Sequence, residues 1–313
     1  MRAYRALLLA TLGLAFVVVV VGAYVRLSDA GLGCPDWPLC YGHPIPEAAS
    51  DASAHGKAWK EMGHRYLAGS LGILILGIAV ASWRLRAHAG LASALVALVV
   101  FQATLGKWTV TMLLKPAIVT AHLLGGMATL AVLLWLVLSA REFQPAPEAR
   151  RARLAAGLAL AVVLTQIALG GWVSANYAAL ACPDLPGCLG QALPPMDFGN
   201  AFHVVRDLGR TSEGALLSIE ALTAIHWTHR MFSLVVLMTV GFAAFRAWQI
   251  SALAPLAAVV AAILAIQFLL GLANVMFGLP LPLAAAHNAG AALLLSSLVV
   301  INFFSFRGLR PSW

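Results

Sequence analysis

Eight apolar stretches, each long enough to cross a bilayer, restrict the fold of this 313-residue chain more than any other feature. A spanning helix needs roughly 20 mostly apolar residues, and its backbone polar groups must be paired within the helix. Composition agrees, because 61% of the residues are hydrophobic and only 10% are charged. The sequence therefore predicts an all-α integral membrane protein with eight transmembrane helices. The stretches are 6–26, 62–83, 92–112, 117–140, 154–174, 222–245, 255–277 and 283–306.

Arginines mark one side of this predicted bundle. The helix ends on that side carry eleven arginines and only two acidic residues, Glu142 and Glu148. Because basic residues stay preferentially on the cytoplasmic side, we expect both termini in the cytoplasm and the opposite helix ends outside. The net charge of +8 then reflects membrane topology, and no nucleic-acid partner is expected. The basic residues at these ends are Arg2, Arg5, Arg84, Arg86, Arg141, Arg150, Arg151, Arg153, Arg246, Arg307 and Arg310.

The two halves of the chain repeat an unusual set of residues. Cys34 and Cys40, in the loop Cys-Pro-Asp-Trp-Pro-Leu-Cys, return 148 residues later as Cys182 and Cys188 in Cys-Pro-Asp-Leu-Pro-Gly-Cys. An insertion after the second cysteine pair lengthens the spacing of the positions that follow. These positions lie 165 residues apart: His64-Arg65 and His229-Arg230, His122 and His287, Gln102 and Gln267, Gly106 and Gly271.

The repeat divides the predicted helices equally. Each half contains four helices, so both halves enter the membrane in the same direction, as in a parallel repeat. We therefore predict two pseudo-symmetric four-helix bundles, 1–141 and 154–313, joined by a cytoplasmic linker, 142–153. The polar segment 189–221 is expected to be a loop with a surface helix.

The repeated histidines are the strongest candidates for a functional site. Ionisable groups inside a bilayer are costly unless they are paired or ligated. His64, His122, His229 and His287 lie at similar depths near the outer face, two in each half. Paired imidazoles in an apolar four-helix bundle are typical of a bis-histidine haem site. Hydrogen bonding between helices is the alternative, and a non-haem metal is disfavoured because few carboxylates lie nearby.

Glu61 distinguishes the first half from the second, where His226 occupies the matching position. It lies three residues before His64, and positions i and i+3 share a helix face. Such a carboxylate suits proton transfer beside a bound substrate. The alternative is an interface glutamate that reaches water or pairs with Arg65. The difference suggests that one half does chemistry and the other moves electrons.

The cysteine pairs favour a small closed ring within each loop, because the two cysteines of each pair are six positions apart with two prolines between them. Disulfides persist on the outer side of a membrane. A structural role and a redox role both remain open, and a four-cysteine zinc site is disfavoured. Arg26, Arg65 and Arg230 lie near the outer boundary, where they could bind haem propionates or act as interface anchors.

Three motifs together resemble the haem A synthases. They are Gly22-Ala-Tyr-Val-Arg26, the loop Gly31-Leu-Gly-Cys34-Pro-Asp-Trp-Pro-Leu-Cys40-Tyr-Gly42, and Glu61-Met-Gly-His64-Arg65. The resemblance extends over the whole chain and is closest to the bacterial type with a cysteine pair in both halves. It implies an oxidoreductase that oxidises the C8 methyl group of haem O to a formyl group, giving haem A for terminal oxidases.

The resemblance also implies roles for particular residues. His64 and His122 would be axial ligands of the substrate haem O, with Glu61 as the catalytic carboxylate. His229 and His287 would be axial ligands of a haem B that transfers electrons. Cys34 and Cys40 would take part through thiol–disulfide exchange, whereas Cys182 and Cys188 would be structural.

The implied setting is a bacterial inner (cell) membrane, with the cysteine loops on the outer face. A haem O synthase would deliver the substrate, the electron donor or acceptor is unknown, and the lipid-facing leucines and valines would permit a homo-oligomer. Two rival functions remain: a di-haem b-type membrane cytochrome that transfers electrons without oxidising a substrate, and a transporter. The cytochrome would explain neither Glu61 in one half alone nor the duplicated cysteine loops. Transporters often have helices broken by proline or glycine near midplane, whereas the proline and glycine clusters here fall mostly at loop boundaries.

Overall fold

The computed structural model describes residues 2–46 and 52–311, and eight long helices dominate this part of the chain. Each is long and apolar enough to cross a membrane. The prediction of an all-α protein with eight spans is confirmed. The long helices are α1 Arg2–Leu27, α2 Ala52–Arg84, α3 Ala89–Thr111, α4 Pro116–Ser139, α5 Arg153–Ala175, α7 Ile219–Trp248, α8 Ala254–Met276 and α9 Leu281–Arg307. The short elements are β1 Gln144–Pro145, η1 Pro147–Ala152, η2 Ala178–Leu180, α6 Phe198–Ala201 and β2 Leu309–Arg310.

Local sequence signals account for several helix ends. Proline stands in the first turn of α4, α8 and α9, where its missing N–H would have no helical partner. At the start of α7, the Ser218 hydroxyl accepts a hydrogen bond from the Ala221 amide at 3.3 Å, as an N-cap residue does. Gly308 ends α9 in the left-handed conformation, with φ of 63°, which glycine adopts without a steric cost.

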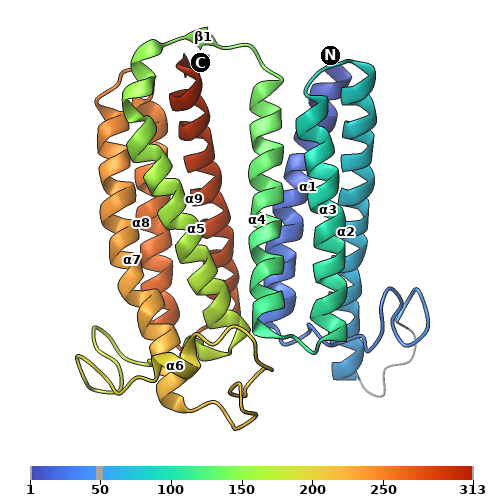
Figure 1. Cartoon of the computed structure of the whole chain (residues 1–313), viewed down its shortest axis with the longest axis vertical. Coiled ribbons are helices and arrows are strands. Elements are labelled where there is room, and N and C mark those ends of the chain that lie inside the picture. Colours follow the sequence, from blue (N-terminus) through green and yellow to red (C-terminus); the bar gives the residue numbers. More distant parts are fainter. Residues whose placement is uncertain (1, 47–51, 312–313) are drawn as a thin grey trace.

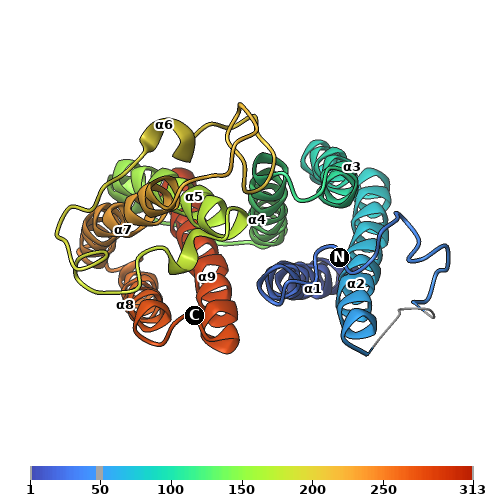
Figure 2. The ribbon, with the colours of Figure 1, turned by 90° about the horizontal axis from the view of Figure 1, so that it is seen from below.

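The helices form two groups that follow the two halves of the sequence (Figures 1 and 2). The first contains α1–α4 and the second contains α5 and α7–α9, while α1, α4, α5 and α9 make the contacts between them. α9 is the most enclosed, with 56% of its most apolar window buried, against 17% for α8. The Trp135 ring of α4 meets the Phe303 ring of α9 edge to face, with centroids 5.1 Å apart. A continuous apolar core thus joins the halves.

Both termini and the linker lie at one end of the molecule, and both cysteine loops lie at the other (Figure 1). At the first end, β1 pairs antiparallel with β2, which attaches the linker to the C-terminal segment. At the second end, α6 is the short helix expected within 189–221. Lys115, between α3 and α4, pairs with Asp207 of this segment at 3.1 Å. The insertion of the second half therefore contacts the first half.

The start of α2 differs from the sequence prediction. The helix begins at Ala52, ten residues before the predicted start at 62, and so includes Lys57 and Lys60. An apolar stretch records only the part of a helix suited to lipid, whereas lysine is a good helix former and continues a helix into polar surroundings. Glu61 and His64 consequently lie well inside α2 rather than at its first turn.

Candidate functional site

The four repeated histidines lie on four different helices. His64 is on α2, His122 on α4, His229 on α7 and His287 on α9. His64 is close enough to His122 for the two rings to interact electrostatically, and the same holds for His229 and His287. Each half of the structure therefore brings together one pair of imidazoles.

The surroundings of these rings contain few polar groups. In every one of the four rings, Nδ1 is buried and has no hydrogen-bond partner among the described residues. Gln267 donates from Nε2 to the backbone carbonyl of His287 at 3.0 Å, and its Nε2 lies 3.4 Å from the ring Nε2. Gln166 donates to the backbone carbonyl of His229 at 3.1 Å. These glutamines stabilise the backbone that carries the histidines.

Two imidazoles in each half suit a porphyrin better than a protein-only metal centre. Structural and catalytic metal sites usually take at least three protein ligands, but within 2–46 and 52–311 no group of three or more His, Cys, Asp or Glu residues could hold a metal ion. A haem brings four equatorial nitrogens of its own and needs only axial ligands from the protein. A pair of neighbouring imidazoles in each half of an apolar bundle therefore fits haem as the ligand of both sites.

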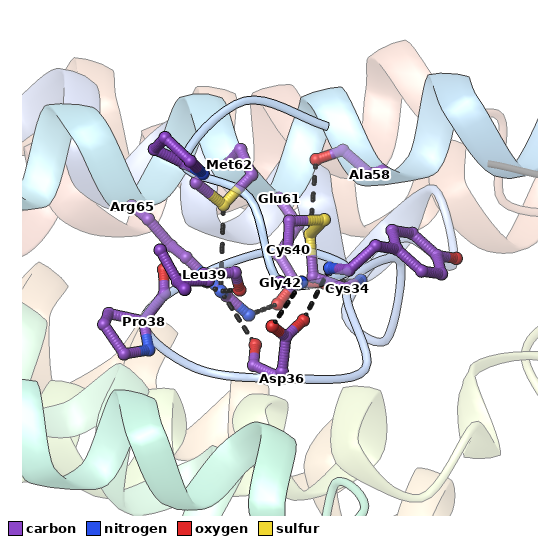
Figure 3. Close-up of a disulfide and its surroundings, with 12 residues drawn as sticks. Cys34, Asp36, Pro38, Leu39, Cys40, Gly42, Ala58, Glu61, Met62 and Arg65 are labelled. Carbon is purple, nitrogen blue, oxygen red and sulfur yellow. Dashed lines mark hydrogen bonds and ion pairs between the residues drawn. A yellow bond between two sulfur atoms is a disulfide. The ribbon is translucent and has the colours of Figure 1, made fainter. Parts of the chain in front are cut away.

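The first cysteine loop is attached to α2 through Glu61 and Arg65 (Figure 3). The Cys34 amide donates to Oε2 of Glu61 at 2.9 Å, and Nη2 of Arg65 binds Oε1 at 2.5 Å. Nη1 of Arg65 also donates to the carbonyls of Asp36 and Leu39, at 3.0 and 2.7 Å. The Glu61 side chain is buried and both of its oxygens accept hydrogen bonds. Of the two interpretations of Glu61, proton transfer beside a substrate or pairing with Arg65, the contacts in the structure match the pairing.

The second cysteine loop is attached to α7 in the same manner. The Cys182 amide donates to Nδ1 of His226 at 3.3 Å. Nη2 of Arg230 donates to the carbonyls of Asp184 and Pro186, at 2.9 and 3.3 Å. His226 thus fills the structural place of Glu61, with a neutral acceptor instead of a carboxylate.

Both predicted disulfides are present, and each closes a ring within its own loop. The Cys34–Cys40 sulfurs are 1.99 Å apart and the Cys182–Cys188 sulfurs 2.05 Å apart. Cys34 and Cys40 are both 0% exposed and pack against Ala58 and Met62 of α2. Their burial leaves no path for a soluble thiol without movement of the loop, so a catalytic role of this pair stays a prediction.

An aspartate closes each loop from inside. The Asp36 carboxylate accepts from the amides of Tyr41 and Gly42, at 2.7 and 2.9 Å. The Asp184 carboxylate accepts from the amides of Leu189 and Gly190, at 2.7 and 2.8 Å. The hydrogen bond from Gly190, with that from Leu189, lowers the pKa of Asp184 below its ordinary value. The loops are therefore held by a carboxylate as well as by a disulfide.

Two of the arginines predicted to bind haem propionates, Arg65 and Arg230, donate to carbonyls of these loops. The third, Arg26, donates to the carbonyl of Ser174 at the end of α5. Within the described residues, Nη1 of Arg230 is buried without a partner, as is Nε of Arg26. These two atoms remain available to a carboxylate ligand, and propionate binding by Arg65 and Arg230 stays a prediction.

The sequence did not predict the contact of Gln166 with the backbone of His229. Val18 occupies the matching position in the first half, so Gln166 is not part of the repeat.

Comparison with known proteins agrees with this geometry. The COX15-CtaA family, described as cytochrome oxidase assembly protein, matches residues 5–299. The chain belongs to this family. The matched range contains both cysteine loops and the four repeated histidines, His64, His122, His229 and His287.

Curated relatives of this family member are similar over most of their length. A heme A synthase of Shewanella oneidensis is 40% identical over 318 residues, which cover 95% of both chains. One of Halalkalibacterium halodurans is 30% identical over 69% of this chain and 73% of the relative. One of Rhizorhabdus wittichii is 27% identical over 91% of this chain and 89% of the relative.

Proposed function

We propose that this protein is a haem A synthase, an oxidoreductase that converts the C8 methyl group of haem O into the formyl group of haem A. The observation that carries the proposal is the 40% identity to a named heme A synthase over 95% of both chains. The two pairs of imidazoles support it, because each pair fits a haem and lacks the third ligand that a protein-only metal centre needs.

In this proposal the first half binds the substrate. His64 and His122 would hold the iron of haem O from two helices and so fix the position of the porphyrin. Conversion of a methyl to a formyl group replaces two C–H bonds by one C=O bond, with loss of four electrons and four protons when water supplies the oxygen atom. The site must therefore orient the methyl group and admit an oxygen donor while excluding competing reactions. The loop carrying Cys34 and Cys40 lies over α2 beside Glu61.

The second half would bind haem B through His229 and His287. When bound there, this cofactor supplies one-electron transfer. The protein contributes the ligand helices α7 and α9, with Gln166 and Gln267 holding the backbone carbonyls of the two histidines. The unpaired Nη1 of Arg230 and Nε of Arg26 are candidate donors to the propionates.

The assignment of chemistry to the first half rests on the position occupied by Glu61 and His226. Both side chains accept the amide of the first cysteine in the neighbouring loop. Only Glu61 can also carry a negative charge and accept a proton at a carboxylate oxygen. Both carboxylate oxygens of Glu61 already accept hydrogen bonds. These contacts support a role of Glu61 in positioning the loop more directly than a role in proton transfer.

The orientation in the membrane is also proposed. We infer that both termini are cytoplasmic, because the arginine-rich helix ends lie with them, and that the cysteine loops face outward at the opposite end (Figure 1). Disulfides persist on that side. A haem O synthase as the source of substrate follows from the proposed reaction.

Two histidine variants test the assignment of the halves. His64→Ala should abolish conversion of haem O and leave haem B bound. His229→Ala should release haem B while haem O binding persists. Haem content is measured by extraction and chromatography after purification from a host that supplies haem O. Equal loss of one haem B from each variant would overturn the synthase and favour the di-haem b-type cytochrome.

A further inference from the structure

Each of the four histidine rings packs against a glycine on the preceding long helix. A Cβ atom on Gly22 of α1 would lie 2.8 Å from Cε1 of His64. One on Gly170 of α5 would lie 3.0 Å from Cε1 of His229. Carbon atoms in favourable contact are about 3.5–4.0 Å apart. The rings therefore occupy space that any larger side chain would take.

The other two histidines repeat the arrangement. A Cβ atom on Gly106 of α3 would lie 3.3 Å from Cε1 of His122, and one on Gly271 of α8 would lie 3.3 Å from Cε1 of His287. We call Gly22, Gly106, Gly170 and Gly271 the ring-facing glycines. In all four pairs the nearest ring atom is Cε1, which lies between the two nitrogens. The contact is thus the same in both halves.

A second observation shows what this contact must do. Metal-binding histidines usually donate from their second nitrogen to a carboxylate, carbonyl or water, which fixes the ring orientation. Here Nδ1 of each ring is buried without a partner among the described residues. With no hydrogen bond at Nδ1, packing must fix the rotation of the ring. The ring-facing glycines supply that packing surface.

We propose that the ring-facing glycines are positioning residues, which fix the orientation of the axial imidazoles toward haem. The inference rests on the proposed function and extends it to residues that would not touch the iron. A methyl group added at these positions meets the far end of a side chain rather than a backbone. The imidazole should therefore move while the helices stay in place.

The distance from the added Cβ to the histidine ring predicts how far each substitution displaces that ring. Gly22→Ala should displace its histidine most, Gly170→Ala next, and the substitutions of Gly106 and Gly271 least. Gly13→Ala on α1 is a matched control, because among the described residues nothing lies within 4 Å of an added Cβ there. Gly157→Ala is the control on α5, where the nearest atoms are 3.9 Å away.

The experiment compares the low-spin haem signals of the purified full-length protein by electron paramagnetic resonance and optical spectroscopy. Gly22→Ala should shift the signal of the first-half haem, and Gly170→Ala that of the second-half haem. We expect haem affinity to fall roughly 10-fold, as for other changes that disturb ligand orientation. Gly13→Ala and Gly157→Ala should match the wild type in haem signal and in thermal unfolding temperature in detergent. Gly22→Ala and Gly170→Ala should lose only the small part of the unfolding temperature that tenfold weaker haem binding accounts for.

Unchanged haem signals in both Gly22→Ala and Gly170→Ala would overturn the inference. A large fall in unfolding temperature confined to these two variants would also overturn it, since the glycines would then serve helix packing. A wild-type protein without low-spin haem would contradict the proposed function itself. The wild-type spectrum therefore distinguishes failure of the inference about the ring-facing glycines from failure of the proposed function.

Discussion

At the scale of the residue, Glu61 and His226 hold their cysteine loops in the same way but differ in charge. Each accepts a hydrogen bond from the first cysteine amide of its loop, at 2.9 and 3.3 Å. Glu61 adds an ion pair with Arg65 that His226 cannot make. A charged group in the first half therefore replaces a neutral acceptor in the second, without changing the attachment of the loop.

Substitution of Glu61 by histidine distinguishes a role in holding the loop from a role in proton transfer. Glu61→His should keep the loop in place, because imidazole can accept the Cys34 amide as His226 accepts that of Cys182. Glu61→Ala should lose the tether, and removal of one partner from a buried hydrogen bond costs about 1–3 kcal/mol. We expect Glu61→His to retain more synthase activity and a higher unfolding temperature than Glu61→Ala. Equal and complete loss of activity in two folded variants would instead assign the essential role to the carboxylate.

The sequence predicted the histidine pairs but not their surroundings. His64 and His122 follow from hydropathy and the repeat, because both signals can be read along the chain without knowledge of how it folds. The hydrogen bond from the Cys34 amide to Glu61 joins residues 27 apart in the sequence, so spacing alone could not reveal it. The role of Gly22 was equally hidden, although its recurrence as Gly170 at the 148-residue spacing was a usable signal.

At the scale of the element, the first loop lies directly against the backbone of its helix. A Cβ atom on Gly33 would fall 2.5 Å from the carbonyl carbon of Lys57 in α2. The matching position in the second half is Ala181, which carries a Cβ without conflict. Only glycine at position 33 permits this approach of loop and helix backbones.

Substitution of Gly33 should therefore act on stability. Gly33→Ala must push the loop away from α2, because the obstacle is backbone and cannot rotate aside. Overpacking of this kind costs about 1–3 kcal/mol, measured as the change in free energy of unfolding in detergent. Gly56→Ala, at a helical position where nothing described lies within 4 Å of an added Cβ, is the control and should not destabilise. Equal stability of the two variants would show that the loop does not need this contact.

Sequence and structure agree least at the start of α2. The other seven predicted spans lie within four residues of the observed ends. Apolar stretches locate the part of a helix that suits lipid, while Lys57 and Lys60 continue α2 in a region that hydropathy excludes. The segment 189–221 was predicted as a loop with a surface helix, but its contact with Lys115 depends on tertiary packing.

At the scale of the whole molecule, the halves meet through residues that match in the repeat. Arg26 donates to the carbonyl of Ser174 at 2.7 Å, and Asp29 accepts from the Tyr177 hydroxyl at 2.9 Å. In both pairs the partners lie 148 residues apart. A two-fold axis through this contact would bring matching positions together, so the contacts favour the pseudo-symmetry, which stays a prediction.

The same contact should respond to acid. Hydrogen bonds from Lys57, and then from Tyr177, lower the pKa of Asp29 below its ordinary value of 3.8. A lowered carboxyl pKa stabilises the fold above the unfolded-state value, and this contribution is lost as pH falls through the folded-state value. Wild-type stability should therefore fall more than that of Asp29→Asn between about pH 5 and pH 3.

The effect should be small, because exposed ion pairs contribute about 1 kcal/mol or less and Asp29 is two-thirds exposed, at 66% of its side chain. Added salt should reduce it further. Thermal unfolding in detergent at two pH values and two salt concentrations measures the difference. Parallel pH dependence of wild type and Asp29→Asn would show that the contacts of Asp29 with Lys57 and Tyr177 do not stabilise the fold.

The most direct test of the central claim is the identity of the haems that the protein carries. The wild type would be purified from a host that supplies haem O, and its haems extracted and identified by chromatography and mass spectrometry. The proposed function predicts haem B together with haem A or an oxidised form of haem O. Haem B alone, with both histidine pairs occupied, would contradict the synthase and identify an electron-transfer cytochrome.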